Sequence, residues 1–378
     1  MTDVLIVFLF WLPVGIVFYH WVGFPVVLWL LTKLARERTA DQSVATPFVS
    51  IVVAARNEEL TIERKIRNCL DLDYPPDRME VVVGSDASDD DTDRILGTFR
   101  DPRLRCFRLP ERRGKSAVLN SLTGRVTGDL VLITDADVSL ARDVLRLMTT
   151  RFVDPDVGLV QLRYRRVNED GNVAEGMFDR WETAVKNLEG RLGAMTTASG
   201  AGMMMRRALF APIPEDTIHD DLVLGLRVFR LGLRAVFEGR AVATCRTEEE
   251  RTEFRRRVKM GRGAAQALSR HLDLLSPRHG VRALAFLSHK VLRLLIPVAI
   301  PGMLVGLALG ISMPGYAAIL ALMALTLLTM PLLLLVEGRW RRLLLPQYYL
   351  LMNVAILAGG IQYVFGPRRG YWERTRRG

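Results

Sequence analysis

The chain has 378 residues, of which 49% are hydrophobic and 25% are charged, and it carries a formal net charge of +11. A mean hydropathy of +0.16 is high for a soluble protein with that charge content, so the apolar residues must be concentrated in segments. The basic excess lacks interleaved aromatic motifs, which favours cytoplasmic loops and anionic membrane lipids as its partners and excludes nucleic acid.

The apolar residues do fall into segments, and the remainder reads as a globular domain. The segments with almost no charge are residues 4–32, 294–336 and 343–366. The three cysteines, Cys69, Cys106 and Cys245, are odd in number and form no C-x-x-C pair. This pattern predicts reduced thiols in a cytosolic domain.

The first apolar segment, residues 4–32, exceeds the about 20 residues that a helix needs to span a bilayer. A signal peptide is the alternative, but Asp3 precedes the segment where a basic region is expected, and no small-residue cleavage site follows. Lys33, Arg36 and Arg38 come directly after it. The positive-inside rule therefore predicts an outside N-terminus and a cytoplasmic domain after the span.

Apolar runs without alternation predict buried strands at residues 48–55, 79–84 and 104–109. Helical spacing separates them, most clearly at residues 60–71. Strands of this kind, interleaved with amphipathic helices, are typical of a parallel sheet that is covered on both faces.

A fourth run of five strand-forming residues, 130–134, leads into Asp135-Ala136-Asp137. In an extended strand, residues i and i+2 point to the same side, so the two carboxylates are expected to converge at the carboxyl end of the strand. Two converging carboxylates favour a divalent cation, Mg²⁺ or Mn²⁺, shared with a diphosphate. The alternative is that an aspartate caps the next helix.

Two other motifs fail on spacing. The acidic run that begins at Asp86 resembles a calcium loop, but Asp91 stands where glycine is required and Gly97 stands where glutamate is required. The Gly-Lys-Ser sequence at Lys115 resembles the end of a phosphate-binding P-loop, but Leu109 occupies the position of the first glycine. The sequence therefore predicts neither an EF-hand nor a P-loop.

Short polar motifs follow one another in a fixed order over most of residues 48–265. They are Ala54-Ala55-Arg56-Asn57-Glu58, Asp86-Ala87-Ser88-Asp89, Gly114-Lys115 with Asn120, Asp135-Ala136-Asp137, Ser199-Gly200-Ala201-Gly202-Met203, and His219-Asp220-Asp221-Leu222 with Gly225-Leu226-Arg227. Their order and spacing resemble the membrane-integrated family 2 glycosyltransferases, which include cellulose, hyaluronan and poly-N-acetylglucosamine synthases. The resemblance implies an α/β domain of the GT-A fold, Rossmann-like with a mostly parallel sheet, and flanking transmembrane helices.

The resemblance also implies a donor site for a UDP-sugar. The nucleoside would bind at Ala55, Arg56, Asn57, Glu58 and Asp86. Asp135 would contact the nucleotide or sugar, and Asp137, beside it, would bind Mg²⁺ or Mn²⁺ on the diphosphate. Lys115 would support the same phosphates, unless it is only a solvated lysine after a turn.

On the acceptor side, Asp220 and Asp221 match the acidic pair of the family. Asp221 would take the proton of the acceptor hydroxyl, and Asp220 would tune it. The alternative is that both aspartates only cap the next helix. Ser199 and Gly200 would lie against the acceptor, because glycine allows the backbone to approach a sugar closely. His219 lacks metal-ligand spacing and is predicted to be structural.

The chain departs from these synthases at their Q-x-x-R-W motif, where it reads Arg256-Arg257-Val258-Lys259-Met260. Arg256 and Lys259 would keep a cation near the diphosphate, but the tryptophan that forms the acceptor platform is absent. Processive synthesis is therefore in doubt. The alternative for this stretch is a basic surface at the membrane interface.

Residues 283–366 are predicted to contain a helix at the membrane interface and further membrane-spanning segments. Residues 283–296 predict an amphipathic interfacial helix, followed by spans at 295–312 and 315–336. The basic residues Arg339, Arg341 and Arg342 predict a cytoplasmic loop, and 343–366 either spans the bilayer or re-enters it.

The predicted organisation has three parts. Residues 1–36 form an N-terminal transmembrane helix, 37–282 the cytosolic GT-A domain, and 283–378 the interfacial helix, the transmembrane segments and a basic tail. The sequence predicts an integral protein of the inner membrane. It is a metal-dependent inverting glycosyltransferase that moves a sugar from a UDP-sugar to a saccharide or lipid-linked acceptor, as in cell-surface polysaccharide synthesis. The alternatives are a single-transfer lipid glycosyltransferase and a non-catalytic, nucleotide-sensing membrane protein.

Overall fold

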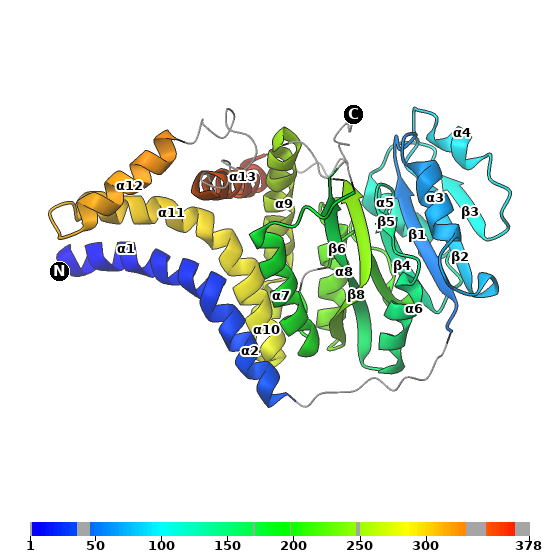
Figure 1. The fold of residues 1–378 in the computed structure, drawn as a ribbon, viewed down its shortest axis with the longest axis horizontal. Helices are drawn as coiled ribbons and strands as arrows, with labels where there is room; N and C mark the ends of the chain where they lie inside the picture. The colour runs from blue at the N-terminus through cyan, green and yellow to red at the C-terminus, as the bar shows by residue number, and fades with distance from the viewer. Residues whose placement is uncertain are drawn as a thin grey trace. The chain divides into compact units, whose positions relative to one another are not determined.

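The computed structural model shows a chain that divides into a helical unit and an α/β unit (Figure 1). The structure describes residues 2–35, 46–168, 171–196, 198–246, 250–329 and 345–366. The described part of the helical unit comprises residues 2–27, 250–270, 286–329 and 345–366. The predicted domain boundaries at 36/37 and 282/283 stay predictions.

The α/β unit is built on one eight-stranded sheet with the order β3-β2-β1-β4-β7-β6-β8-β5. The strands are β1 (Val49–Ala55), β2 (Met79–Ser85), β3 (Leu104–Arg108), β4 (Leu130–Asp135), β5 (Ser139–Leu140), β6 (Val157–Val167), β7 (Met203–Arg206) and β8 (Arg234–Arg246). Strands β3, β2, β1 and β4 are parallel to one another, and β6 is parallel to β8. Strand β7 runs antiparallel between β4 and β6, and β5 pairs antiparallel with β8. The predicted mostly parallel sheet is confirmed.

Helices cover both faces of this sheet. They include α3 (Ile62–Leu70), α4 (Thr92–Leu96), α5 (Lys115–Leu122), α6 (Val144–Thr149), α7 (Met177–Arg191) and α8 (Asp220–Arg230); α10 (Val281–Ala285) also belongs to the α/β unit. The predicted helix at 60–71 and the predicted strands at 48–55 and 79–84 agree with α3, β1 and β2 to within two residues at each end.

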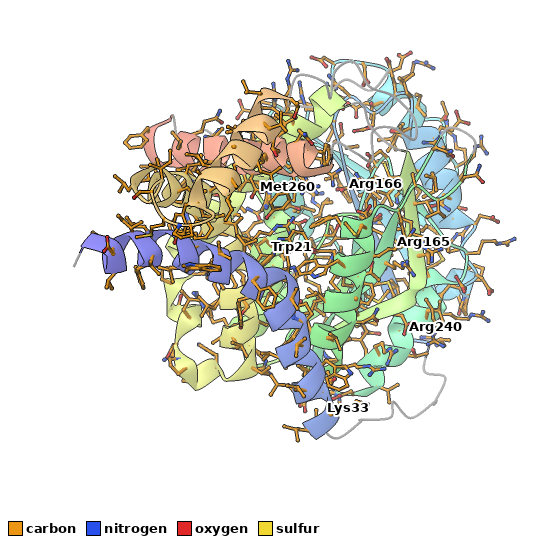
Figure 2. The ribbon with its side chains drawn as sticks, turned by 60° about the vertical axis from the view of Figure 1, so that its left-hand side comes forward. Trp21, Lys33, Arg165, Arg166, Arg240 and Met260 are labelled. Carbon is orange, nitrogen blue, oxygen red and sulfur yellow. The ribbon has the colours of Figure 1, made fainter. Side chains whose placement is uncertain are left out.

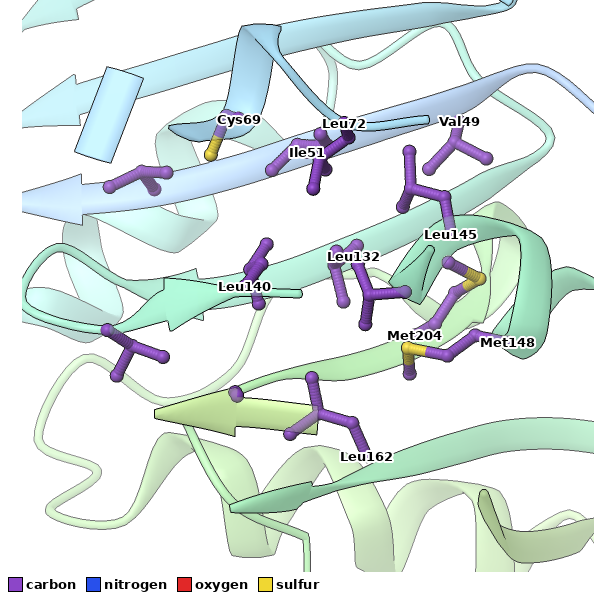
Figure 3. Packing of buried hydrophobic residues seen from close by; sticks show 14 of the residues in the cluster. Val49, Ile51, Cys69, Leu72, Leu132, Leu140, Leu145, Met148, Leu162 and Met204 are labelled. Atoms are coloured by element: carbon purple, nitrogen blue, oxygen red, sulfur yellow. The ribbon is translucent and has the colours of Figure 1, made fainter. Parts of the chain in front are cut away.

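The core has two layers because successive residues of each strand face opposite sides of the sheet. From β1, Val49 and Ile51 pack with α3 and α6, in the layer that Figure 3 shows around Cys69 and Leu145. Val52 and the other alternate residues pack with α5 and α8 on the opposite face. A sheet that is buried on both faces needs apolar side chains at every position, which explains why its strands show no alternation.

The carboxyl ends of three strands meet at one edge of the sheet. In the register of the ladder, Ala55 of β1 pairs with Ser85 of β2, and Ala54 pairs with Asp135 of β4. The polar residues that follow these strands in the sequence are therefore brought to the same edge, which is where open α/β sheets bind ligands.

The helical unit contains most of the apolar segments. Its elements include α1 (Thr2–Phe18), the π-helical turn η1 (Tyr19–Gly23), α9 (Glu250–Arg270), the π-helical turn η7 (Phe286–Val291), α11 (Leu292–Leu309), α12 (Tyr316–Leu328) and α13 (Leu345–Phe365); α2 (Phe24–Leu34) continues from η1. Among the described residues, three helices are long and apolar enough to cross a membrane: Asp3–Leu34, Val281–Leu309 and Gln347–Phe365.

The predicted spans agree with these helices in part. The segments 4–32 and 343–366 each coincide with one of them, and the predicted interfacial helix and the span after it form parts of the single helix Val281–Leu309. The span predicted at 315–336 contains the shorter apolar helix α12, which ends at Leu328, and residues 330–336 of that span lie outside the described residues. The predicted basic loop at 339–342 and the basic tail lie outside the described residues.

Several polar side chains inside the helical unit are hydrogen-bonded, which lowers the cost of placing them in an apolar environment. A buried ring nitrogen of His20, Nδ1, lies 3.0 Å from the carbonyl oxygen of Ser288. Tyr19 Oη lies 2.9 Å from Ser288 Oγ, and Trp21, labelled in Figure 2, donates to Tyr349 Oη at 3.2 Å. His20 and Ser288 belong to the two π-helical turns, η1 and η7, so these irregular turns meet at the polar contact.

Helices α9 and α13 touch through their backbones. A Cβ atom added at Gly261 of α9 would overlap the carbonyl oxygen of Ile356, and one at Gly359 of α13 would overlap the carbonyl oxygen of Val258. Glycine is therefore required at both contact positions, because it allows the two backbones to approach closely.

Candidate active site

The loops that follow β1 and β2 are fastened to each other at the sheet edge. The Arg56 guanidinium donates to the carbonyl oxygens of Asp86 at 2.6 Å and Ala87 at 2.9 Å. The Glu58 amide lies 2.7 Å from Thr92 Oγ1, and Asn57 Oδ1 accepts a hydrogen bond from the Asp89 amide at 3.1 Å. The predicted nucleoside residues Ala55, Arg56, Asn57, Glu58 and Asp86 are thus brought together.

Asp86 itself anchors the loop before α5. Its side chain is fully buried, and its two carboxylate oxygens accept the amide N–H groups of Arg113 at 2.7 Å and Gly114 at 2.9 Å. These bonds fix the start of α5 and place Lys115, the first residue of that helix, at the sheet edge. The role predicted for Asp86 in nucleoside binding stays a prediction.

Lys115 connects the two groups of acidic residues. Its Nζ lies 2.8 Å from Asp135 Oδ1 and 3.1 Å from Asp220 Oδ2. Burial alone would lower the pKa of the lysine ammonium, but the charges of Asp135 and Asp220 outweigh burial and raise it above its ordinary value. Lys115 is therefore a cation held between the end of β4 and the start of α8, and the view of it as a solvated lysine is not supported.

Asp220 and Asp221 begin α8 but lie in different surroundings. Asp220 is buried, and burial raises the pKa of its carboxyl although the Lys115 ammonium opposes this shift. Asp221 is only half-buried, and its carboxylate accepts the amide N–H groups of Gly200 at 3.0 Å and Leu222 at 2.7 Å. One carboxylate is thus paired with a lysine, and its neighbour contacts the predicted acceptor loop.

The Ser199–Gly202 loop closes the other side of the cluster. The carbonyl oxygen of Gly200 accepts the Asp135 amide N–H at 2.9 Å, and buried Gln161 accepts the Ser199 amide N–H at 2.8 Å. A Cβ atom at Gly200 would lie 2.8 Å from Asp135 Oδ2 and 3.1 Å from Lys115 Nζ. Only glycine allows the loop backbone to approach the charged groups this closely.

The prediction that Asp135 and Asp137 both belong to an extended strand is wrong for Asp137. Strand β4 ends at Asp135, and Asp137 lies in the turn that follows, so the alternation of an extended strand does not apply to Asp137. Asp137 nevertheless lies close to the same edge, and its Oδ2 is 3.6 Å from Cys245 Sγ of β8. The turn, rather than the pleat of the strand, decides where its carboxylate points.

The donor set at this turn fits a hard divalent cation. Among the described residues, no group of three or more His, Cys, Asp or Glu side chains could hold a metal on its own. Asp135 and Asp137 offer carboxylate oxygens, and the Asp135 side chain is 38% exposed. Mg²⁺ is commonly bound by one or two carboxylates together with substrate phosphates, and two carboxylates suffice for such a site.

Not every predicted site residue belongs to the α/β unit. Arg256 and Lys259 lie on α9, which is part of the helical unit, and both are exposed. Their predicted approach to the diphosphate stays a prediction.

Two polar residues that support the site were not expected. Gln161 of β6 is fully buried behind the Ser199–Gly202 loop, and Lys65 of α3 is buried beneath the end of β4. A signal for Lys65 exists in the sequence, because it lies three residues after Ile62 and four before Cys69, on the apolar face of its helix. A lysine at such a position must find polar partners inside the protein.

Comparison with known proteins agrees with this geometry. Residues 50–213 match the family model described as Glycosyl transferase family 2. The chain is 32% identical over 245 residues to the β-monoglucosyldiacylglycerol synthase of Synechocystis sp. (strain ATCC 27184 / PCC 6803 / Kazusa), with 57% of this chain and 50% of that protein covered. It is 23% identical over 231 residues to the poly-β-1,6-N-acetyl-D-glucosamine synthase of Staphylococcus epidermidis (strain ATCC 35984 / DSM 28319 / BCRC 17069 / CCUG 31568 / BM 3577 / RP62A), with 59% and 56% covered. The chain thus spans about half the length of these relatives.

A solved structure shares the fold over nearly the whole chain. It is the mannosyltransferase PcManGT from Pyrobaculum calidifontis in complex with GDP-Man and Mn²⁺, which matches with a TM-score of 0.72 and 24% identity over 97% of this chain and 99% of that one. The predicted GT-A fold with flanking apolar helices is confirmed, and so is the predicted resemblance to family 2.

Proposed function

We propose that the protein transfers a sugar from a UDP-sugar to a lipid or lipid-linked acceptor, because residues 50–213 match the family model described as Glycosyl transferase family 2. One observation carries the proposal. Lys115 joins Asp135, at the end of β4, to Asp220 of α8, while Asp221 and Asp135 both bond to Gly200 of the loop between them. Such a cluster can bind a diphosphate on one side and activate a hydroxyl on the other.

The donor would bind where the loops after β1, β2 and β4 meet. A divalent cation, Mg²⁺ or Mn²⁺, would be held by Asp135 and Asp137 and would supply neutralisation of the negative charge on the departing diphosphate. Lys115 is placed to exchange its ion pair with Asp135 for one with a phosphate oxygen, because its ammonium already lies 2.8 Å from that carboxylate. The solved structure of the similar mannosyltransferase holds GDP-Man and Mn²⁺, which supports a metal-dependent nucleotide-sugar site.

On the acceptor side, Asp221 is the proposed general base. Its carboxylate is half-buried and bonded to the Gly200 amide, so it lies beside the loop that would contact the acceptor. In a single displacement, the carboxylate removes the proton of the acceptor hydroxyl while that oxygen attacks the sugar carbon from the face opposite the diphosphate. This reaction inverts the configuration at that carbon. Asp220 would remain paired with Lys115 and would hold that lysine in place.

Two features favour a lipid acceptor and a single transfer. The relative from Synechocystis is named for the synthesis of β-monoglucosyldiacylglycerol, and this chain lacks the tryptophan of the Q-x-x-R-W motif that processive synthases use. The second candidate is extension of a saccharide chain, which the similarity to a poly-β-1,6-N-acetyl-D-glucosamine synthase favours.

The proposed location is the inner membrane, with the catalytic unit in the cytoplasm. In the part of the chain that the structure describes, three helices are long and apolar enough to span a membrane, and the basic residues that follow the first span support this orientation. Cys106 of β3 is exposed, whereas Cys69 and Cys245 are buried. In intact cells, a membrane-impermeant thiol reagent should therefore leave Cys106 unlabelled, and permeabilisation should allow labelling. Labelling in intact cells would reverse the proposed orientation.

The catalytic proposal can be tested with detergent-purified protein. UDP-glucose, UDP-galactose, UDP-N-acetylglucosamine and GDP-mannose would each be supplied with diacylglycerol, and with Mn²⁺, Mg²⁺ or a chelator. We expect one UDP-sugar to yield a glycolipid and free UDP when the metal is present, because the carboxylate pair needs a cation to accept a diphosphate. Mass spectrometry of the lipid product identifies the sugar, and NMR of its anomeric proton tests inversion.

Other results of the same assay would favour the alternatives. Products of increasing saccharide length would favour chain extension. Tight UDP binding without release of sugar from any donor would favour the nucleotide-sensing alternative and would contradict the proposed transfer. Product from GDP-mannose alone would retain the enzyme but change the proposed donor.

A further inference from the structure

A buried lysine lies beneath the Asp135–Asp137 turn. Lys65 belongs to α3, and the residue is only 2% exposed. Its Nζ donates to Thr134 Oγ1 at 2.9 Å and to the carbonyl oxygen of Val138 at 2.8 Å. The two acceptors belong to the residues immediately before and after the turn, so one amino group holds both ends of the turn.

The same contact reaches the acceptor loop. Thr134 Oγ1, which accepts the hydrogen bond from Lys65, donates its own hydrogen to the carbonyl oxygen of Ala201 at 2.9 Å. Thr134 is itself buried, so this chain of bonds is shielded from water. Through Thr134, the Lys65 side chain therefore connects the end of β4, the Asp135–Asp137 turn and the Ser199–Gly202 loop.

Burying the Lys65 amino group has an unfavourable free energy of desolvation. Burial lowers the pKa of Lys65, and the nearby Cys69, Asp135 and Cys245 only partly oppose that shift. A methionine has nearly the same length and could occupy this buried position without desolvating a strongly polar group. The benefit of a lysine must therefore come from its hydrogen bonds to the turn.

We propose that Lys65 is a positioning residue that holds the Asp135–Asp137 turn in the shape that binds a divalent cation and diphosphate. This inference rests on the proposed function, because it concerns the same site. Outer partners that orient metal-binding side chains typically change metal affinity by about 10–100-fold when they are removed. The lysine acts here through the backbone and hydroxyl groups on either side of the two carboxylates.

The test is the Mn²⁺ concentration that gives half-maximal UDP binding, measured by titration with the full-length protein in detergent. We expect Lys65→Met to raise this concentration by about 10–100-fold. The thermal unfolding temperature should stay unchanged or increase, since a buried amino group is replaced by an apolar group of similar size. Lys186→Met is the matched control, because Lys186 is a partly buried lysine of α7 that pairs with Glu182 instead. It should leave the Mn²⁺ requirement unchanged.

Thr134 provides an independent arm if Lys65→Met does not fold. Thr134→Val removes the hydroxyl that joins Lys65 to Ala201 and should raise the Mn²⁺ requirement. Thr134→Ser keeps the hydroxyl and should have the Mn²⁺ requirement of the wild type. A wild-type-like Mn²⁺ requirement in folded Lys65→Met, or in Thr134→Val when the lysine variant is unfolded, would overturn the inference. Failure of the wild-type protein to bind UDP in the presence of Mn²⁺ would instead count against the proposed donor site.

Discussion

Replacement of Asp221 by asparagine is expected to lower the rate of sugar transfer by about 10²–10⁴-fold, the usual range for loss of a general base. Asparagine keeps the shape of the side chain and can still accept the Gly200 amide N–H, but it cannot take a proton. The affinity for the UDP-sugar should change little, because Asp135, Asp137 and Lys115 remain. Transfer rate and donor affinity, measured in parallel on purified protein, separate these two effects.

Asp220→Asn is the matched control for that prediction. It should damage turnover less, since Asp220 is buried against Lys115 and is not bonded to the acceptor loop. Loss of its charge would instead weaken the hold on the lysine and alter donor affinity. If Asp220→Asn proves the more damaged in turnover with donor binding intact, the assignment of the base moves to Asp220.

Asp137→Ala is expected to abolish metal-dependent UDP binding. Only Asp135 would then remain of the two carboxylates at the turn, and Lys115 already lies 2.8 Å from that residue. The loss should exceed the about 10–100-fold effect that is typical of removing an outer partner of a metal site. Calorimetric titration of UDP into the protein, with Mn²⁺ and with a chelator, measures it directly.

The control for this experiment lies at the opposite end of the strands. Asp77 precedes β2 at its amino end, and its side chain is 80% exposed. Asp77→Ala should bind UDP in the presence of Mn²⁺ as the wild type does. Unchanged UDP affinity in Asp137→Ala under the same conditions would remove Asp137 from the proposed metal site.

The sheet edge that carries the site could be predicted because local sequence determines it. Uninterrupted apolar runs identify β1, β2 and β4, and in parallel strands the residues that follow each run must gather at one edge. The order of the polar motifs then indicates which loops meet. That reasoning correctly brought Arg56, Asp86 and Asp135 together.

The contacts between distant residues could not be predicted in this way. Lys115 and Asp220 are far apart in the sequence, and their ion pair depends on how α5 and α8 pack on the sheet. The position of Asp137 depends on where β4 stops, which is decided by its hydrogen bonds to β1 and β7 rather than by its own residues. Strand β7, with its three methionines Met203–Met205, gives no signal of its antiparallel direction.

The backbone contact between α9 and α13 bears on how the protein can be released from cells. Side chains larger than glycine at Gly261 or Gly359 would not fit, so the two helices are closely packed. The basic helix α9 is therefore expected to stay bound to the apolar helix α13. Concentrated salt screens the attraction between arginine and anionic headgroups but does not make apolar surface soluble in water. A salt wash should therefore leave the protein in the particulate fraction, and micelle-forming detergent should be needed to extract it.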